Sequence, residues 1–108
     1  MIWLEPWEHI PDTPEWAADR QGWQRRFQKE IGPHHELSGL DTKLIGRRFD
    51  CDDALFSIPD GRVAFAHLTW SEEAGVSFSL EVDLYKSLED WGREHMAVDH
   101  KDWVDHGN

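Results

Sequence analysis

The stretch that decides the fold reads ALFSIPDGRVAFAHLTW and spans residues 54–70. The PDG sequence at residues 59–61 is typical of a tight hairpin turn, because proline and glycine favour the backbone angles that such a turn needs. The apolar runs on its two sides, residues 54–58 and 62–70, are therefore predicted to be antiparallel strands. Both alternating sets of side chains in the second run are largely apolar, which predicts a strand at the centre of the sheet.

Two further strands are predicted to flank this hairpin. Residues 42–49 are expected to form a strand that ends at the acidic turn of residues 50–53. Residues 76–85 alternate apolar and polar side chains, which is the pattern of a half-buried strand with one solvated face. The sequence thus predicts an antiparallel 3–4-stranded meander.

Helices are predicted before and after the meander. The TPE sequence at residues 13–15 has the hydroxyl cap, the first-position proline and the first-turn acid of a helix start, and the helical pattern continues to Glu30. Ser87 is expected to cap a second, C-terminal helix. Residues 1–12 are expected to be an irregular arm, and residues 100–108 a frayed tail.

Together these elements predict one α+β domain over residues 1–108. Its architecture is expected to be an antiparallel 3–4-stranded meander with an N-terminal and a C-terminal helix packed on one face. A chain of 108 residues has the length of one ordinary domain, and the sequence contains no internal repeat or low-complexity segment.

Composition narrows the class of protein. The net charge is −11, no apolar run approaches the length of a membrane span, and the first residues contain no basic side chain of a secretory signal. The chain has one cysteine, Cys51, which excludes an intrachain disulfide and a thiolate-rich zinc site. We therefore expect a cytoplasmic protein that binds no nucleic acid, no membrane and no cofactor, and whose acidic surface favours a basic protein partner.

Seven tryptophans indicate aromatic surface beyond the needs of the core. Tryptophan buries a large ring and is the residue type most enriched at binding hot spots. Three tryptophans lie outside the predicted regular elements and are expected to be exposed binding anchors: Trp3, Trp7 and Trp103. The other four are expected to belong to the core: Trp16, Trp23, Trp70 and Trp91.

One cluster offers weak catalytic candidates. The turn sequence DCDD at residues 50–53 could fold across to His67, so that Asp52 or Asp53 would pair with the imidazole in a general-base or metal-dependent site. The favoured alternative is a solvated turn and a histidine satisfied within the core. Cys51 is not expected to be a nucleophile, because the flanking acids raise the pKa of its thiol.

The C-terminal segment offers weak metal-ligand candidates. His95 and Asp99 are four residues apart, as are Asp102 and His106, and helical spacing would place each pair on one face. The alternative is an acidic terminus that carries these residue types without a site.

Several motifs carry a family resemblance. Residues 30–100 resemble a small family of bacterial proteins of unknown function through the sequences EIGPH, RRFDCDDALF, DGRVA, HLTWS and SLEDW. The resemblance implies no activity, cofactor or site residue. The family is usually richer in proline and aromatics after the tryptophan that corresponds to Trp70, whereas here residues 71–75 read SEEAG, so a different partner is expected if this loop serves recognition. In size, acidity and tryptophan content the chain is also similar to immunity proteins that neutralise bacterial toxins.

Three function hypotheses follow. The first is a small acidic cytoplasmic binding protein, such as an immunity-type inhibitor of a basic toxin or nuclease. The second is a small enzyme or metal-dependent protein centred on His67 and the turn at residues 50–53. The third is a structural module that forms a homodimer through its tryptophan-rich faces.

Overall fold

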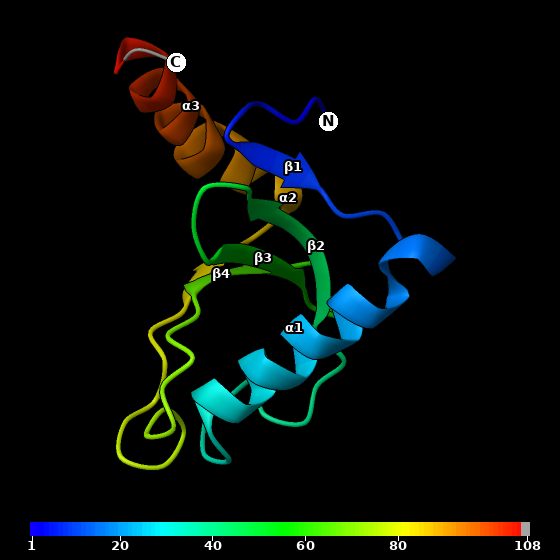
Figure 1. Cartoon of the computed structure of the whole chain (residues 1–108), viewed down its shortest axis with the longest axis vertical. Coiled ribbons are helices and arrows are strands. Elements are labelled where there is room, and N and C mark those ends of the chain that lie inside the picture. Colours follow the sequence, from blue (N-terminus) through cyan, green and yellow to red (C-terminus); the bar gives the residue numbers. More distant parts are fainter. Residues whose placement is uncertain (107–108) are drawn as a thin grey trace.

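Five strands follow one another in sequence order and form one antiparallel sheet (Figure 1). The computed structural model describes residues 1–106, and Gly107 and Asn108 lie outside the described part. The predicted α+β meander with N- and C-terminal helices is confirmed, with five strands in place of three or four. The strands are β1 (Trp7–His9), β2 (Lys43–Arg48), β3 (Asp53–Ser57), β4 (Val63–His67) and β5 (Asp83–Tyr85).

The predicted hairpin forms the centre of the sheet. Strands β3 and β4 pair antiparallel, and the amide of Ile58 donates to the carbonyl of Arg62 at 3.0 Å to close the turn. Gly61 has a φ of 98°, a left-handed conformation that glycine adopts without steric cost. The local turn chemistry read from the sequence therefore predicts this element correctly.

The N-terminal arm is more ordered than the sequence indicates. The expectation of an irregular segment over residues 1–12 is wrong at its centre, where β1 pairs antiparallel with β2 and Trp7 lies opposite Arg48. Pro6, Trp7 and Ile10 are buried. A three-residue edge strand has too short an alternation to be recognised without its pairing partner.

The strand predicted for residues 76–85 is reduced to β5 at its end. The segment before β5 is a loop that binds the C-terminal end of the first long helix: the amide of Leu80 donates to the carbonyl of Glu30 at 2.9 Å. Gly75 makes this approach feasible, because a Cβ atom there would lie 1.8 Å from the carbonyl oxygen of Lys29. The alternating apolar residues before β5 therefore belong to a loop that is bound to α1, and they do not extend the sheet.

Both helices begin close to the predicted positions, and the C-terminal helix extends further than predicted. A 3-10 turn, η1 (Pro14–Trp16), leads into α1 (Ala17–Ile31). The C-terminal helix is continuous through α2 (Leu88–Trp91), the π-helical segment η2 (Gly92–Met96) and α3 (Ala97–Asp105). The Ser87 cap is confirmed, since its hydroxyl accepts from the amide of Asp90 at 3.1 Å. The frayed tail expected over residues 100–108 is helical as far as Asp105, and its last two residues lie outside the described part.

The two helices cover opposite faces of the sheet, which corrects the expectation that both pack on one face (Figure 1). On one face, Phe27 and Ile31 of α1 pack against a cluster that includes Phe56. On the other face, Trp91 and Met96 join a second cluster. The reason lies in β3 and β4, whose side chains are apolar on both faces, so that each face needs a helix to cover it. No helix within residues 1–106 has the length and apolar character required to cross a membrane.

Candidate functional site

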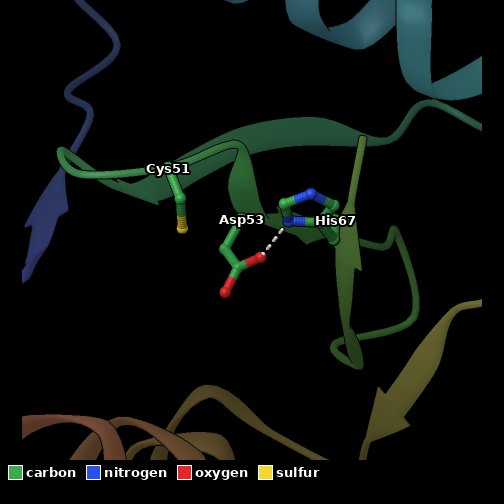
Figure 2. A group of neighbouring side chains, drawn as sticks. All are labelled: Cys51, Asp53 and His67. Carbon is green, nitrogen blue, oxygen red and sulfur yellow. Dashed lines mark hydrogen bonds and ion pairs between the residues drawn. The ribbon is translucent and has the colours of Figure 1, made fainter. Parts of the chain in front are cut away.

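Cys51, Asp53 and His67 converge at the end of the β3–β4 hairpin that is remote from its turn (Figure 2). Asp53 and His67 are direct cross-strand partners, and the His67 Nδ1 atom lies 2.6 Å from the Asp53 Oδ1 atom. One ligand atom from each of the three side chains lies within 4.8 Å of the other two. The predicted pairing of His67 with a carboxylate of the turn is therefore present, and the carboxylate is that of Asp53. Asp52 is not a member of this group, and its backbone carbonyl accepts from the amide of Leu68.

His67 is not a core histidine, contrary to the favoured alternative. Its side chain is 59% exposed, whereas that of Asp53 is 16% exposed. The C-terminal helix covers this face of β4 at Phe65, whose ring centroid lies 4.1 Å from that of His95. His67 is the next residue on the same face and lies at the end of the strand, where solvent reaches it.

The thiol of Cys51 is held in its protonated form. Burial raises its pKa above the ordinary value, and the negative charges of Asp53 and Asp50 raise it further. The backbone amide of Asp53 and the positive charge of Arg48 act in the opposite direction without reversing the shift. These directions agree with the prediction that Cys51 is not an activated nucleophile.

An open groove of about 590 Å³ lies beside His67, between β4, β5 and the loop before β5. Its walls combine two aromatic rings, those of Phe65 and Phe78, with two carboxylates, those of Glu81 and Asp83. The other lining residues are His67, Thr69, Ser79 and Leu80. Asp83 lies directly opposite Phe65 in the β4–β5 register, so the sheet itself places an acid next to an aromatic ring.

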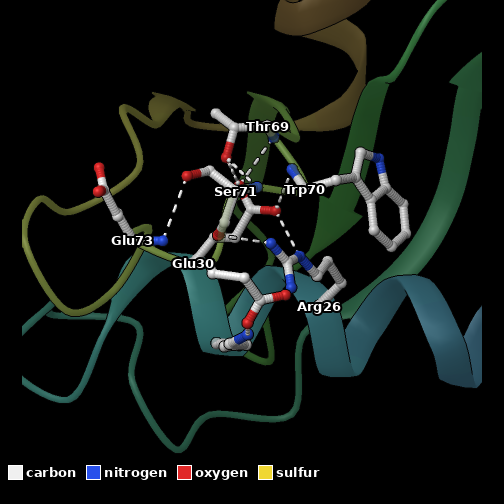
Figure 3. A network of polar contacts seen from close by, with 8 residues as sticks. Arg26, Glu30, Thr69, Trp70, Ser71 and Glu73 are labelled. Atoms are coloured by element: carbon white, nitrogen blue, oxygen red, sulfur yellow. Dashed lines mark hydrogen bonds and ion pairs between the residues drawn. The ribbon is translucent and has the colours of Figure 1, made fainter.

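Glu30 anchors the segment that follows β4 (Figure 3). Its buried carboxylate accepts from the amide and the hydroxyl of Thr69 at 2.8 and 2.7 Å, from the amide of Trp70 at 2.8 Å, and from the Arg26 Nε atom at 2.6 Å. Arg26 also donates to the carbonyl of Ser71 at 2.7 Å. Burial acts to raise the pKa of Glu30, but the hydrogen bonds from Thr69, Arg26 and Trp70 outweigh it and hold the pKa below its ordinary value.

Trp70 is the exposed tryptophan of the described chain, although the sequence places it in the core. The residue is 46% exposed, and its φ of 56° is a left-handed conformation that is strained for a bulky side chain. The hydrogen bond from its amide to Glu30 holds this conformation. Its ring meets the edge of Trp23 at 5.5 Å, and the guanidinium of Arg26 lies 5.4 Å from its centroid. Of the other predicted core tryptophans, Trp91 is buried and Trp16 and Trp23 are partly buried.

The three predicted binding anchors are not exposed rings. Trp7 is only 2% exposed and packs against Trp91, so the expectation of an exposed anchor is wrong for this residue. Trp3 is partly buried and stacks on His9 at 5.5 Å. Trp103 is partly buried on α3 and meets the edge of Phe49 at 5.5 Å. Their position outside the predicted elements indicated exposure, but β1 and α3 place them against neighbouring side chains.

The helical spacing of the C-terminal segment brings each candidate histidine next to its acid. The His95 Nε2 atom lies 3.2 Å from Asp99 Oδ2, and the His106 Nδ1 atom lies 3.1 Å from Asp102 Oδ1. The other ring nitrogen of His95 lies 3.0 Å from the hydroxyl of Tyr85. Both ring nitrogens of His95 therefore contact protein groups. The contact between His95 and Tyr85 connects the C-terminal helix to β5.

Asp99 predicts an acid-sensitive contribution to stability. Burial acts to raise the pKa of Asp99, but hydrogen bonds from His95 and Trp7 and the positive charge of Arg48 outweigh it and hold the pKa below its ordinary value of 3.8. A carboxyl group whose pKa is depressed by folding stabilises the fold above its unfolded-state pKa, and this stability is lost as the pH falls through the folded-state pKa. The free energy of unfolding in urea should therefore decrease between about pH 5 and about pH 2. Compared with the wild type, this decrease in the free energy of unfolding should be smaller in Asp99→Asn. The control Asp19→Asn removes an exposed acid and should show the same decrease as the wild type. Equal decreases in the two variants would contradict this role of Asp99.

Comparison with models of protein families, with curated proteins and with solved structures finds no match to this chain. The site is therefore defined by its own residues. Sequence reasoning identified His67 and Asp53 but missed the groove residues Phe78, Glu81 and Asp83, because the loop that carries two of them was read as a strand. The aromatic residue Phe78 followed by the two acids Glu81 and Asp83 was the available signal.

Proposed function

We propose that this chain is an acidic cytoplasmic binding protein whose partner is a basic protein, and that a lysine or arginine side chain of the partner enters the groove beside His67. The observation that carries the proposal is the groove itself, which is lined by two exposed acidic residues and two aromatic rings. Such a combination matches a long cationic side chain, which has an apolar stem and a charged end.

The carboxylates of the groove are available to a partner. Within residues 1–106, neither Glu81 nor Asp83 forms an ion pair with a basic side chain, and both residues are exposed. The net charge of −11 adds a long-range field that increases the rate of encounter with a basic protein. Charge therefore supports the choice of a basic partner at short and at long range.

The aromatic rings supply the apolar part of the contact. Phe78 is 44% exposed and Phe65 is partly buried, so both rings offer surface to an incoming side chain. A cation over an aromatic face gains about 0.5 to 2 kcal/mol, depending on how well the contact excludes water. Burial of the side-chain stem adds to this free energy.

Trp70 is a second exposed aromatic residue that a partner could contact, and its ring lies on α1 against Trp23 and Arg26. It follows Thr69, which lines the groove, and Glu30 holds both residues in place. An exposed tryptophan that is already ordered loses little conformational freedom on binding, which is favourable for a hot spot. Trp70 thus takes the role that the sequence assigned to Trp3, Trp7 and Trp103.

An inhibitor of a basic toxin or nuclease is the partner class that we favour. Such an inhibitor needs no catalytic group of its own, only a surface complementary in charge to its target. Cys51 is a free and partly buried cysteine, which suits the reducing interior of a cell.

The proposal is tested by capture from a bacterial lysate with the purified chain as bait, followed by elution with increasing salt and identification by mass spectrometry. We expect a basic protein that is released by salt. The double variant Glu81→Gln/Asp83→Asn should weaken this capture by up to about 30-fold, because each exposed charge contact contributes up to about 1 kcal/mol. Phe78→Ala should weaken it as well.

The matched control is Glu5→Gln/Glu94→Gln. It removes the same net charge from exposed positions outside the groove. If both double variants lose capture equally, the long-range field is responsible and the groove is not the docking site. Capture of a second copy of this chain alone, with a dimer in light scattering, would favour the homodimeric alternative instead.

A further inference from the structure

We propose that Cys51, Asp53 and His67 bind a divalent transition metal ion of the Zn²⁺ type, with one coordination position open to solvent. The proposal does not depend on the basic partner, because it uses these three side chains and none of the groove carboxylates. Figure 2 shows the three side chains directed into the same region beside the ends of β3 and β4.

The donor set selects the class of metal. It comprises one sulfur, one carboxylate oxygen and one imidazole nitrogen. Thiolate and imidazole favour Zn²⁺ and similar borderline ions, whereas Mg²⁺ and Ca²⁺ prefer sets made of oxygen atoms only. The single sulfur therefore makes a site for Zn²⁺ or Co²⁺ more favourable than one for the hard cations that an acidic turn alone would attract.

Strand pairing brings the ligands together. The β3–β4 register places Asp53 directly opposite His67, and the ladder continues past both residues through the hydrogen bond from the Leu68 amide to the Asp52 carbonyl. Cys51 lies in the bend that leads into β3, two residues before Asp53, and its sulfur lies within 4.8 Å of the other two ligand atoms. Strand pairing thus positions Asp53 and His67, and the bend before β3 brings Cys51 beside them.

The distances are compatible with a shared ion. Tetrahedral Zn²⁺ with bonds of about 2.0 to 2.3 Å places its ligand atoms roughly 3.3 to 3.8 Å apart. Asp53 Oδ1 and His67 Nδ1 are 2.6 Å apart and the three ligand atoms all lie within 4.8 Å of one another, so small side-chain movements would bring them to these separations. The ion would replace the proton that joins Asp53 to His67 and the thiol proton of Cys51, and both protons would be released to solvent. The exposed imidazole can rotate to adjust the remaining distances.

Three protein ligands leave the fourth tetrahedral position for water or a substrate atom. Structural zinc sites use four protein ligands, whereas sites with three are those at which zinc activates water or polarises a carbonyl group. His67 is exposed and lines the groove, so the open position is accessible from solvent. The geometry therefore favours an accessible ion over a closed structural site.

The neighbouring charges are compatible with a cation. Asp50 adds negative charge close to Cys51, although it is already bound to Arg48 through two contacts of 2.9 Å. His95 and Asp99 are a competing pair elsewhere in the fold, but both nitrogens of His95 contact protein groups. The Cys51 group is thus the better site within the described residues.

The test is a titration of the full-length chain with Co²⁺ alone, followed by absorption spectroscopy. We expect one ion per chain, a thiolate-to-cobalt charge-transfer band in the near ultraviolet, and intense visible bands of tetrahedral cobalt that disappear when Zn²⁺ is added. Cys51 is the one cysteine of the sequence, so a thiolate band identifies this residue directly.

Variants test whether cobalt binds to these three side chains or to other residues of the chain. Cys51→Ser should abolish the thiolate band, and His67→Ala should weaken cobalt binding by about 100-fold, because loss of even an outer-shell partner costs about 10- to 100-fold. His67 is exposed and its replacement should leave the circular dichroism spectrum unchanged. His34→Ala, which removes an exposed histidine far from the hairpin in sequence, is the matched control and should bind like the wild type.

Two results would overturn the proposal. The first is saturation with Co²⁺ without a thiolate band. The second is an affinity in His67→Ala equal to that of the wild type, which would place the metal at another histidine. Because His67→Ala is expected to fold normally, the result stands even if Cys51→Ser is unstable.

Discussion

Replacement of Trp7 by alanine is expected to lower the free energy of unfolding by about 3 to 5 kcal/mol, the usual cost of removing a buried large aromatic side chain. Trp7 is 2% exposed, its ring centroid lies 4.8 Å from that of Trp91, and its indole Nε1 atom donates to Asp99 Oδ2 at 2.8 Å. The variant would lose this packing and leave the partly buried Asp99 without one of its donors. Urea denaturation followed by circular dichroism measures the change.

Trp70→Ala is the matched control for Trp7→Ala. It removes the same side chain from a position that is 46% exposed, so the expected loss is about 1 kcal/mol or less. The same variant should weaken capture of the basic partner, which Trp7→Ala would affect only through unfolding. Equal stability of the two variants would mean that β1 and Trp7 are not part of the core.

Replacement of Glu30 by leucine is expected to cost about 3 to 5 kcal/mol, because it leaves the partly buried charge of Arg26 without its partner. The side chain of Arg26 is 12% exposed and that of Glu30 is fully buried. The amides of Thr69 and Trp70 would lose their acceptor at the same time. The segment after β4 should then detach from α1, which hydrogen exchange at these two amides would detect.

A double variant tests the cause of this loss. Arg26→Met/Glu30→Leu removes both charges, and it should be more stable than Glu30→Leu alone if an unpaired buried charge is the main cost. Glu72→Ala is the control, since Glu72 pairs with Lys29 on the surface with a side chain that is 89% exposed, and its loss should cost less than about 1 kcal/mol. A double variant less stable than Glu30→Leu would instead assign the loss to the hydrogen bonds of Thr69 and Trp70.

Part of the candidate site could be predicted from the sequence. The sequence offered the pairing of His67 with a carboxylate of the turn as an alternative to a core histidine, and the hairpin register that places Asp53 opposite His67 is what produces it. The exposure of His67 could not be predicted, because it depends on where the C-terminal helix stops covering β4. The groove was missed for a similar reason: residues 76–82 alternate like a strand, yet the Leu80 amide and the Ser79 hydroxyl donate to carbonyls at the end of α1. The amides of Val76 and Ser77 donate to the carbonyl of Glu73 within the loop.

The exposure of the tryptophans could not be predicted from the sequence either. Trp7 and Trp70 have equivalent chemistry, but one is buried by an edge strand and a remote helix, and the other is exposed by a left-handed backbone held by Glu30. Position relative to predicted elements therefore gave the wrong exposure for both residues.

The sequence by itself determined the central hairpin, the start of the first helix and the Ser87 cap, because each depends on interactions between residues within a few positions of one another. It also indicated that β4 lies inside the sheet and not at its edge, since the alternation of that strand is apolar on both sides. Only the tertiary structure decided which helix covers which face, which tryptophan is exposed and which acids line the groove. These features depend on contacts between residues such as Glu30 and Trp70 or Trp7 and Asp99, which lie far apart in the chain and meet only after the sheet and helices have packed together.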